Sequence, residues 1–459
     1  ENPSVPLYDE SLLADVPLQT VIVKARTLEP GYAVKRMVSA NSSAGSSDGN
    51  GHTTGPQGLV DYAKSFVKRT LRSTANLLLQ PDPQILWHHH AVEAGLRVLT
   101  QRKHDAIFVT APPFSSLLVG AELSRRTGLP LVLDYRDEWG LSNAYLENKQ
   151  HGAWSSWWQR RLQHHVVRAA SALVATTRHS ADTLAEIAAE ANRGRCASNR
   201  PKLLVTHIYN GFDSADLHNG IAPRSDAVLR PPLNGRDVYE LAYVGTLWNL
   251  TSVEPLVRAV QRLCQQSPEL AARLELHFAG RRTGPQDELL NQLQGLPCRV
   301  VRSPYLDHDA ALRLMQSADG LCLLLSDLPH AGRVVPAKLF EYLALCKPII
   351  AIVPPGEASD LLCDCPLSFV HIPSDVAGLA RRLGDEIERH RLGVPLLAGI
   401  WDANQYERRS LAGQLAELLQ SVTRTRFGEP GGVSPRTTQH SGPGANAARL
   451  ANLIAAPSR

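Results

Sequence analysis

Residues 320–353 read GLCLLLSDLPHAGRVVPAKLFEYLALCKPIIAIV, and this stretch decides the fold. Apolar runs stand at both of its ends, at 320–325 and 348–353, and a short amphipathic segment at 337–344 separates them. Two buried strands with a helix between them form one βαβ unit, which is the repeating unit of a parallel sheet. We therefore expect an α/β protein.

The same alternation of apolar runs and amphipathic segments extends in both directions from this stretch. It predicts further helices at 116–127, 154–170, 252–266 and 307–317. The predicted strands fall into two series, which indicates two domains, each built around a parallel sheet. The first series lies at 20–24, 106–110, 131–134, 172–176 and 202–208, and the second at 240–244, 275–279, 299–302, 320–325, 348–353 and 368–371.

The length of 459 residues is sufficient for two or three domains, and changes in composition mark their boundaries. Because one strand candidate alone precedes a Ser- and Gly-rich stretch, and the chain starts with Glu1, we expect an opening βα portion to be absent. The expected boundaries are 1–212 for an N-terminal domain with a mobile loop at 40–58, 213–236 for a linker, 237–398 for a second domain, 399–420 for a helix returning to the first domain, and 421–459 for a disordered tail.

The net charge does not point to a nucleic acid. The chain carries 48 Lys and Arg against 44 Asp and Glu, a formal charge of +4. The tail at 421–459 holds five arginines and one glutamate, so the remainder of the chain is neutral. A nucleic-acid surface needs a cluster of cations, and this distribution does not provide one.

The seven cysteines are irregularly spaced, and several stand in apolar runs, which is typical of buried, reduced thiols in a cytoplasmic protein. Cys363 and Cys365 have neither a second pair nor a nearby histidine, so we expect no metal there. The run His88-His89-His90 resembles a metal site, but adjacent residues cannot face one point, and we interpret His89 as lining a polar cleft. No stretch approaches the roughly 18 apolar residues of a membrane span.

Ligands of open parallel sheets bind beyond the carboxyl ends of the strands, so the residues that follow each strand are site candidates. In the first domain, Asp134, Arg136, Asp137 and Trp139 form or follow the end of a strand. A guanidinium between two carboxylates suits a polyhydroxylated or phosphorylated ligand. A structural ion pair is the alternative, and the residue types alone do not separate the two.

Ser115 and Ser116 stand between another strand and the helix that follows it. Either serine can cap this helix, and we favour that interpretation. The alternative is that the exposed amides of the helix start meet an anion.

The second domain contains the most informative candidates. Pro336 occupies a first helical position, which leaves the amides of Ala337 and Lys338 free, and the helix dipole favours a phosphate there. Lys338 adds a cation, and Glu341, three residues later on the same face, can accept hydrogen bonds from ribose hydroxyls. The alternative is an intrahelical ion pair between Lys338 and Glu341.

At this point the motifs resemble those of a known family, the family-four retaining glycosyltransferases of GT-B fold, in the subgroup with a Pro-x-Lys-x-x-Glu-Tyr donor motif. The resemblance spans residues 8–420 and implies two Rossmann-like domains facing one cleft, with the acceptor on the N-terminal side and the nucleotide sugar on the C-terminal side. The segments that carry it are TAPPFSS at 110–116, GLPLVLDYRDEW at 128–139, YNGFD at 209–213, YVGT at 243–246, and PAKLFEYLA at 336–344 with Lys347-Pro348.

The resemblance also implies roles for the residues of the donor motif. Glu341 stands where the family holds the nucleotide ribose, and Ala337 and Lys338 stand where helix amides hold the diphosphate. Arg333 occupies a position where many members of the family carry a glutamate that contacts the donor sugar. The subgroup commonly lacks this glutamate.

In that family the loop that Gly245 and Thr246 open usually carries basic residues, and since none follow here, Arg281 and Arg282 are expected to substitute for them. Arg136 and Asp137 stand where related enzymes place a His-Asp or equivalent pair near the reaction centre, so the resemblance implies such a position for them. The acceptor side is expected to include Ser115, Ser116, Asp134, Trp139 and His89.

The resemblance implies transfer of a sugar from a nucleoside diphosphate sugar to a saccharide or lipid-linked hydroxyl acceptor, with retention and without a metal or other cofactor, in polysaccharide or glycolipid biosynthesis. The alternatives are a nucleotide-sugar epimerase or hydrolase of the same fold and a non-catalytic nucleotide-sugar-binding module. The basic, amphipathic stretch at 59–79 suits either peripheral membrane contact or an ordinary surface helix.

Overall fold

The computed structural model describes residues 16–28, 79–139, 153–193, 203–217, 228–229, 237–397 and 401–426. The predicted loop at 40–58, the amphipathic stretch up to residue 78, most of the predicted linker and the tail beyond residue 426 lie outside these ranges. The chain divides into two compact units. The first contains Glu1–Ala175, Thr183–Thr206 and Leu419–Pro430, and the second contains Thr176–Asp182, His207–Leu418 and Gly431–Arg459.

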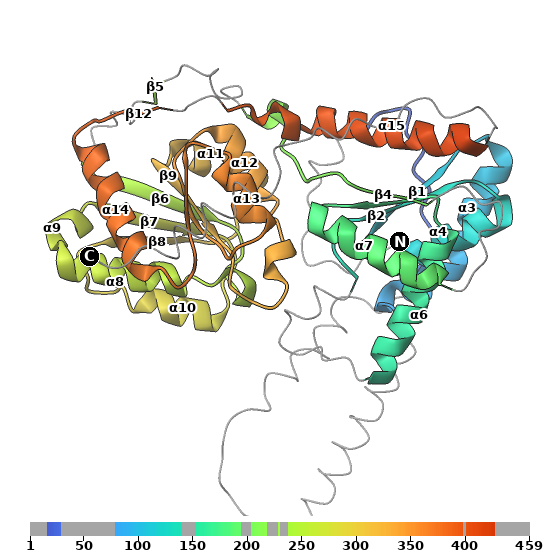
Figure 1. Ribbon diagram of the computed structural model, residues 1–459, viewed down its shortest axis with the longest axis horizontal. Helices are drawn as coiled ribbons and strands as arrows, with labels where there is room; N and C mark the ends of the chain where they lie inside the picture. The colour runs from blue at the N-terminus through green and yellow to red at the C-terminus, as the bar shows by residue number, and fades with distance from the viewer. Residues whose placement is uncertain are drawn as a thin grey trace, which may run out of the picture. The chain divides into compact units, whose positions relative to one another are not determined.

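The first unit contains a four-stranded sheet whose strands follow one another in chain order (Figure 1). β1 pairs in parallel with β2, and β2 in parallel with β3, and both central strands are buried along their whole length. Apart from Asp134 in β2, these two strands are apolar, as expected of parallel strands whose two faces are both covered. The strands are β1 (Ile107–Ala111), β2 (Leu131–Tyr135), β3 (Ala172–Ala175) and β4 (Leu204–His207), and the helices are α3 (His88–Gln101), α4 (Ser115–Thr127), α6 (Ala153–Ala169) and α7 (Arg178–Asn192), with the 3-10 helix η3 (Pro83–Trp87). The first residues of α7, up to Asp182, and His207 of β4 belong to the second unit.

The second unit contains a six-stranded sheet in the order β11-β10-β9-β6-β7-β8, and every pair of neighbours is parallel. This is the strand order of a Rossmann fold, with the order of connection reversing between β6 and β9. The strands are β6 (Tyr239–Val244), β7 (Leu274–Ala279), β8 (Arg299–Ser303), β9 (Gly320–Leu324), β10 (Ile349–Ile352) and β11 (Ser368–His371).

The other elements of this unit are the helices α8 (Glu254–Gln266), α9 (Pro268–Ala271), α10 (Gly284–Asn291), α11 (His308–Ser317), α12 (Lys338–Leu345), α13 (Glu357–Cys363) and α14 (Val376–Arg391), the 3-10 helices η4 (Ser214–Asp216), η5 (Asn249–Thr251), η6 (Ala331–Arg333) and η7 (Ala403–Tyr406), and a two-stranded pair of β5 (Val228–Leu229) with β12 (Leu396–Leu397). The last helix, α15 (Arg408–Arg426), begins in the second unit and continues beyond residue 420, at which the returning helix was expected to end.

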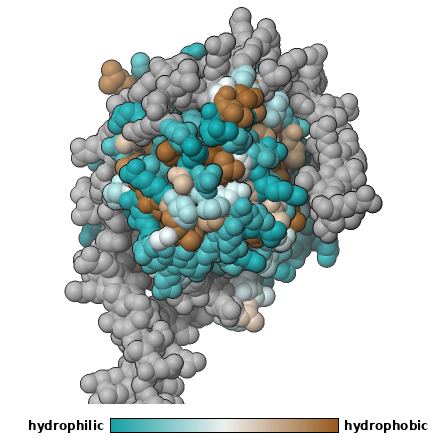
Figure 2. All heavy atoms as spheres, turned by 90° about the vertical axis from the view of Figure 1, so that its left-hand side faces the viewer, coloured by the Kyte–Doolittle hydropathy of each residue, from teal (hydrophilic) through white to brown (hydrophobic). Residues whose placement is uncertain are grey.

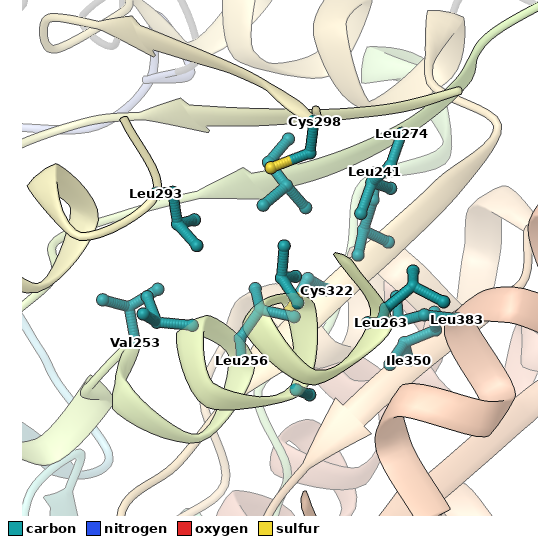
Figure 3. Close-up of a cluster of buried hydrophobic side chains, with 14 of the residues drawn as sticks. Leu241, Val253, Leu256, Leu263, Leu274, Leu293, Cys298, Cys322, Ile350 and Leu383 are labelled. Carbon is teal, nitrogen blue, oxygen red and sulfur yellow. The ribbon is translucent and has the colours of Figure 1, made fainter. Parts of the chain in front are cut away.

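Alternate side chains of the central strands enter two different hydrophobic cores. Leu321 and Leu323 of β9 pack into a core on one face of the sheet, whereas Cys322 and Leu324 pack into the core on the other face. Figure 3 shows the second of these cores, where Leu241, Cys322 and Ile350 from the sheet meet Leu256, Leu263 and Leu383 from α8 and α14. Both faces are therefore buried, which explains why these strands lack the polar alternation of a half-exposed sheet.

The predicted α/β class with two parallel sheets is confirmed, and ten of the predicted strands match strands of the structure. The strand predicted at 20–24 is wrong, since these residues have no regular structure. Val21, Ile22 and Val23 are 54%, 61% and 51% exposed. A β-branched run forms a strand only where a neighbouring strand pairs with it, and within the described ranges no strand does so here.

The described surface offers no membrane-spanning element. Within the residues that the structure describes, every helix is too short or too polar to cross a bilayer. Figure 2 shows a face of the second unit on which hydrophilic side chains predominate and apolar ones are scattered. The six cysteines in the described part, which are all but Cys196, are free thiols, as their spacing suggested.

Candidate functional site

The topological switch point of the sheet in the second unit lies at the carboxyl ends of β6 and β9. From β6 the chain proceeds outward to β7 and β8, and from β9 it proceeds in the opposite direction to β10 and β11. The loops that follow these two strands therefore diverge, and such a switch point is where open parallel sheets bind ligands. The predicted donor-side residues follow β6, β7 and β9.

Lys338 brings a cation to this switch point. It is the first residue of α12, and its Nζ donates a hydrogen bond of 2.8 Å to the carbonyl oxygen of Val244 at the end of β6. The same Nζ lies 3.8 Å from the centre of the Tyr243 ring. Burial lowers the pKa of Lys338 to about 7, so its amine can gain or lose a proton near neutral pH.

Two glycines keep the space beside Lys338 open. Gly245 has a φ of +140°, and a Cβ at this position would lie 2.6 Å from Lys338 Nζ. Gly280, at the end of β7, has a φ of +133°, and a Cβ there would collide with the carbonyl group of Gly245. Both positions therefore require glycine, because of the backbone conformation and because of the close approach.

The two candidate arginines after β7 differ in their surroundings. Arg282 is held by Asp287 at 2.8 Å and by the carbonyl oxygens of Ser303 at 2.8 Å and Gly280 at 3.0 Å. Arg281 is exposed, its guanidinium lies 5.8 Å from the centre of the Tyr305 ring, and no carboxylate in the described ranges pairs with it. Arg281 is thus the arginine of the two that has its charge available for a ligand.

The loop after β6 is fixed by hydrogen bonds that involve Thr246. The carbonyl oxygen of Thr246 accepts bonds from the Tyr243 hydroxyl at 2.9 Å and from the Thr251 hydroxyl at 2.6 Å. The Thr246 side chain is exposed. The amide of Leu247 donates to the carbonyl oxygen of Arg281 at 2.8 Å, which fastens this loop to the one after β7.

The start of α12 has free amides. Pro336 and Ala337 precede the helix, and their carbonyl oxygens accept bonds from Leu339 at 3.0 Å and from Phe340 at 3.2 Å. Within the described part of the chain, no acceptor meets the amides of Ala337 and Lys338. An anion at this point would meet two N–H groups and the positive end of the helix dipole.

Glu341 lies one turn further along α12. Within the described part of the chain, no ion pair joins Glu341 to Lys338, because Lys338 points to Val244 instead. Burial raises the pKa of the Glu341 carboxyl, and the nearby charges of His308 and Arg408 oppose this shift. The intrahelical pair that we considered as an alternative does not form.

Arg333 lies in η6, between β9 and α12, and is half-buried. Its carbonyl oxygen accepts a bond of 3.2 Å from the Thr177 hydroxyl. The preceding His330 has a left-handed backbone, with a φ of 67°. A Cβ at Gly332 would lie 2.8 Å from the carbonyl oxygen of Pro355, so this loop packs tightly against the loop after β10.

Glu357, the first residue of α13, was not predicted from the sequence. Its side chain is 4% exposed and accepts hydrogen bonds from the amides of Arg178 at 2.6 Å and His179 at 2.9 Å, the first two residues of α7. It also accepts a bond of 2.5 Å from the Tyr209 hydroxyl. The rule of reading the residues after each strand would have found Glu357, which follows β10.

In the first unit, Asp134 is buried, and its carboxylate contacts other side chains of the protein. It is 6% exposed, accepts a hydrogen bond of 3.0 Å from Thr110, and lies 3.7 Å from Arg136. Burial raises the pKa of Asp134, and Arg136 opposes the shift. Asp137 is exposed, and desolvation raises its pKa while Arg136 again opposes the shift. The ion pair with Asp134 is therefore structural, whereas Asp137 is accessible to a ligand.

Neither Ser115 nor Ser116 caps α4, so that expectation is wrong. The N-cap residue is Phe114, and the amide of Ser115 donates to the carboxylate of Asp82 at 2.9 Å. Ser115 is the first residue of the helix itself, and its buried hydroxyl meets no hydrogen-bond partner in the described part of the chain. Trp139 stacks on Phe114 with ring centres 4.9 Å apart.

His89 lies in the first turn of α3, is exposed, and contacts the ring of His90 at 5.6 Å. In the described ranges, no three His, Cys, Asp or Glu side chains form a cluster able to hold a metal ion. The structure thus brings together Asp134, Arg136 and Asp137 in one unit, and Gly245, Arg281 and Lys338 in the other.

Comparison with known proteins gives a domain match. Residues 56–199 match the family model described as a glycosyl transferase 4-like domain. The match agrees with the expectation of a glycosyltransferase domain in that part of the chain. No curated protein sequence is significantly similar to this chain.

Several solved structures are similar at low sequence identity. An α,α-trehalose-phosphate synthase (UDP-forming) from Burkholderia vietnamiensis is 12% identical, with a TM-score of 0.48, over 75% of this chain and 78% of that one. HepE of Anabaena, solved in complex with UDP and glucose, is 20% identical, with a TM-score of 0.46, over 72% and 81%. A trehalose-6-phosphate synthase analysed with bisubstrate glycomimetics is 13% identical, with a TM-score of 0.47, over 86% and 98%.

Proposed function

We propose that this protein is a glycosyltransferase of GT-B fold that moves a sugar from a nucleoside diphosphate sugar to a hydroxyl acceptor, with retention and without a metal. The observation that carries this proposal is the position of Lys338, whose Nζ lies 2.8 Å from Val244 at the switch point of the six-stranded sheet. The amides of Ala337 and Lys338, at the start of the same helix, meet no acceptor in the described part of the chain and support the same proposal.

These groups suit the leaving group of a sugar transfer. When the bond between the anomeric carbon and the phosphate oxygen breaks, its electron pair leaves with the diphosphate, and negative charge grows there. The amides of Ala337 and Lys338 and the Lys338 ammonium would stabilise that charge, with Arg281 contributing from the loop after β7. Glu341 would accept hydrogen bonds from the ribose hydroxyls.

The acceptor end of the reaction is assigned to the first unit. There, Arg136 and the exposed Asp137 follow β2, and Asp137 would orient the acceptor hydroxyl or take its proton. The glycosyl transferase 4-like match over residues 56–199 includes both residues. We propose a saccharide or lipid-linked acceptor, in polysaccharide or glycolipid biosynthesis, and a cytoplasmic enzyme in peripheral contact with the membrane.

Calorimetric titration with UDP, GDP and ADP tests the donor site. We expect Lys338→Met to weaken binding of the preferred nucleotide about 30-fold, since a hydrogen bond to a charged group contributes about 2 kcal/mol. Glu341→Ala should weaken binding less, by about tenfold. Lys347→Met is the matched control, because Lys347 donates to the carbonyl oxygen of Ala318 at 2.5 Å and lies after the other end of α12.

The proposal fails if both variants bind every nucleotide as the wild type does. Incubation of the preferred nucleotide sugar without an acceptor separates the remaining functions. Free or isomerised sugar at a steady rate would indicate a hydrolase or an epimerase, and tight binding with no turnover of any acceptor would indicate a binding module.

A further inference from the structure

The helix α6 displays a cluster of exposed tryptophans near its first residue. Trp154, Trp157 and Trp158 are 60%, 45% and 40% exposed, whereas the other four tryptophans of the chain are half-buried. The spacing of three and four residues places the three side chains on one side of the helix. We call these three residues the tryptophan cluster.

The rings of the tryptophan cluster lie against one another, and a large part of each side chain stays exposed. The ring centres of Trp154 and Trp157 are 5.0 Å apart and stacked, and those of Trp157 and Trp158 are 5.9 Å apart. Three large apolar side chains thus form one continuous patch. Scattered apolar residues are ordinary on a protein surface, but a contiguous aromatic patch marks an interaction site.

The exposure of the cluster does not arise from a loosely attached helix. The opposite side of α6 packs into the unit through Val166 and Val167, which are 0% and 1% exposed. Near the cluster, the Gln159 side chain accepts a bond of 2.6 Å from Trp139 and donates one of 3.0 Å to the carbonyl oxygen of Pro81. Figure 1 shows that one end of α6 extends beyond the other helices of its unit.

The charged side chains of α6 itself, apart from its histidines, are all positive. The sequence of α6 contains three arginines and no Asp or Glu. Arg161 lies with its guanidinium 5.1 Å from the centre of the Trp157 ring, and within the described ranges it pairs with no carboxylate. Arg160 is 3.7 Å from Glu190 of α7, with both side chains largely exposed. A positively charged aromatic patch is complementary to an anionic apolar partner.

We infer that the tryptophan cluster and Arg161 form a docking surface for an anionic lipid bilayer. Tryptophan rings favour the headgroup region of a membrane, where an apolar body and a polar N–H are both accommodated. Arg161 would meet lipid phosphates beside the rings. Trp154 and Trp157 are stacked on each other, which leaves fewer ring faces open for a saccharide to stack on.

This inference gives residues to the membrane contact of the proposed function and rests on that function for its biological role. The test uses the full chain and two kinds of vesicle, one of phosphatidylcholine alone and one of phosphatidylcholine with an equal part of phosphatidylglycerol. We expect binding to the mixed vesicles in a sedimentation assay. The combined variant Trp154→Ser, Trp157→Ser and Trp158→Ser should bind them about tenfold or more weakly.

Two further variants separate the contributions of charge and apolar area. Arg161→Gln should weaken binding to the mixed vesicles about fivefold, because one cation near a charged surface contributes about 1 kcal/mol. Binding to the vesicles of phosphatidylcholine alone should not change. The control Leu392→Ser with Val394→Ser removes side chains that are 58% and 46% exposed in the second unit. This control should bind vesicles as the wild type does.

Equal binding of the mixed vesicles by wild type and the combined variant would overturn the inference, as would an absence of binding by the wild type. A soluble oligosaccharide that shifts the tryptophan emission of the wild type alone would show a saccharide site instead. A dimer lost in the combined variant would show a contact between copies. Nucleotide binding by the same variants should be unchanged, so failure here leaves the donor site untouched.

Discussion

The helices α7 and α12 begin in opposite electrostatic surroundings. At the start of α7, the Glu357 carboxylate accepts the first two amides, and the Thr177 hydroxyl accepts the amide of Ser180 at 3.1 Å. At the start of α12, no acceptor in the described part of the chain meets the amides of Ala337 and Lys338. The first helix start already holds an anion, and the second holds a cation, Lys338.

This comparison shows how the same local geometry serves two purposes. A helix start that holds its own carboxylate is stabilised and closed to outside anions. A helix start without one, beside a lysine, is less stable alone and suited to bind a phosphate. The start of α4, which the Asp82 carboxylate meets at 2.9 Å, belongs to the first kind. Of these three, α12 is thus the candidate for an external anion.

The largest effect is expected when α7 is made to resemble α12. The substitution Glu357→Ala leaves two amides and the Tyr209 hydroxyl without their buried acceptor, so the free energy of unfolding should fall by about 3 kcal/mol. Urea unfolding measures this loss, and Glu288→Ala, at an exposed position on α10, serves as the control. Added acetate should recover part of the lost free energy of unfolding. A loss in Glu357→Ala no larger than that in the control would contradict the claim that the Glu357 carboxylate stabilises the start of α7.

A smaller effect is expected at α4. Asp82→Ala removes the acceptor of a single amide, that of Ser115, and should lower the free energy of unfolding by about 1.5 kcal/mol. Thermal and urea unfolding report it. Glu93→Ala is the matched control, because Glu93 forms an exposed ion pair with Arg97 at 2.9 Å on α3. Equal destabilisation by the two substitutions would mean that the carboxylate at the helix start has no special role.

The smallest effect is expected from the titration of Lys338 when it is measured over the single pH unit from about 7 to about 8. Its pKa is about 7 in the folded protein, below the ordinary value of 10.5, so the unfolded chain binds more protons between these values. The free energy of unfolding should therefore rise with pH, by about 1 kcal/mol from about pH 7 to about pH 8, and show no further change from this group below the folded pKa. Lys338→Met should remove this rise, whereas Lys103→Met, at an exposed position, should keep it. The same slope in wild type and Lys338→Met would exclude Lys338 as its source.

The titration of Lys338 also affects binding. A diphosphate favours the charged amine, so it should bind with uptake of a proton above about pH 7, and its affinity should decline as the pH rises. Calorimetry in buffers of different ionisation enthalpy measures the proton uptake. No uptake by the wild type at mildly alkaline pH would contradict a diphosphate beside Lys338.

Much of the fold could be predicted from the sequence, because long apolar runs in a βαβ rhythm have few alternatives. The prediction of a strand at 20–24 was wrong, since strand formation depends on a neighbouring strand that the local sequence does not specify. The motif at 336–344 indicated where Lys338 and Glu341 would lie on the helix. It did not indicate that their side chains would form no ion pair with each other. Lys338 turns toward Val244 because a carbonyl oxygen distant in sequence lies within its reach.

The residues that hold helix starts were the least predictable part. Asp82 and Ser115 are 33 positions apart, and Glu357 and Arg178 are 179 positions apart, so no local pattern joins them. Arg282 illustrates the converse problem. Its residue type and its place after a strand suit a ligand, and only the structure shows that Asp287 and two carbonyl oxygens already occupy its guanidinium.

Arg282 has a consequence for the thermodynamics of binding. By joining the ends of β7 and β8, and with Leu247 bonded to Arg281, it holds the loops on one side of the switch point in a single arrangement. A ligand that arrives there meets groups whose conformational entropy folding has already removed. Association then orders few additional side chains, so that a small ligand retains more of its contact energy as affinity.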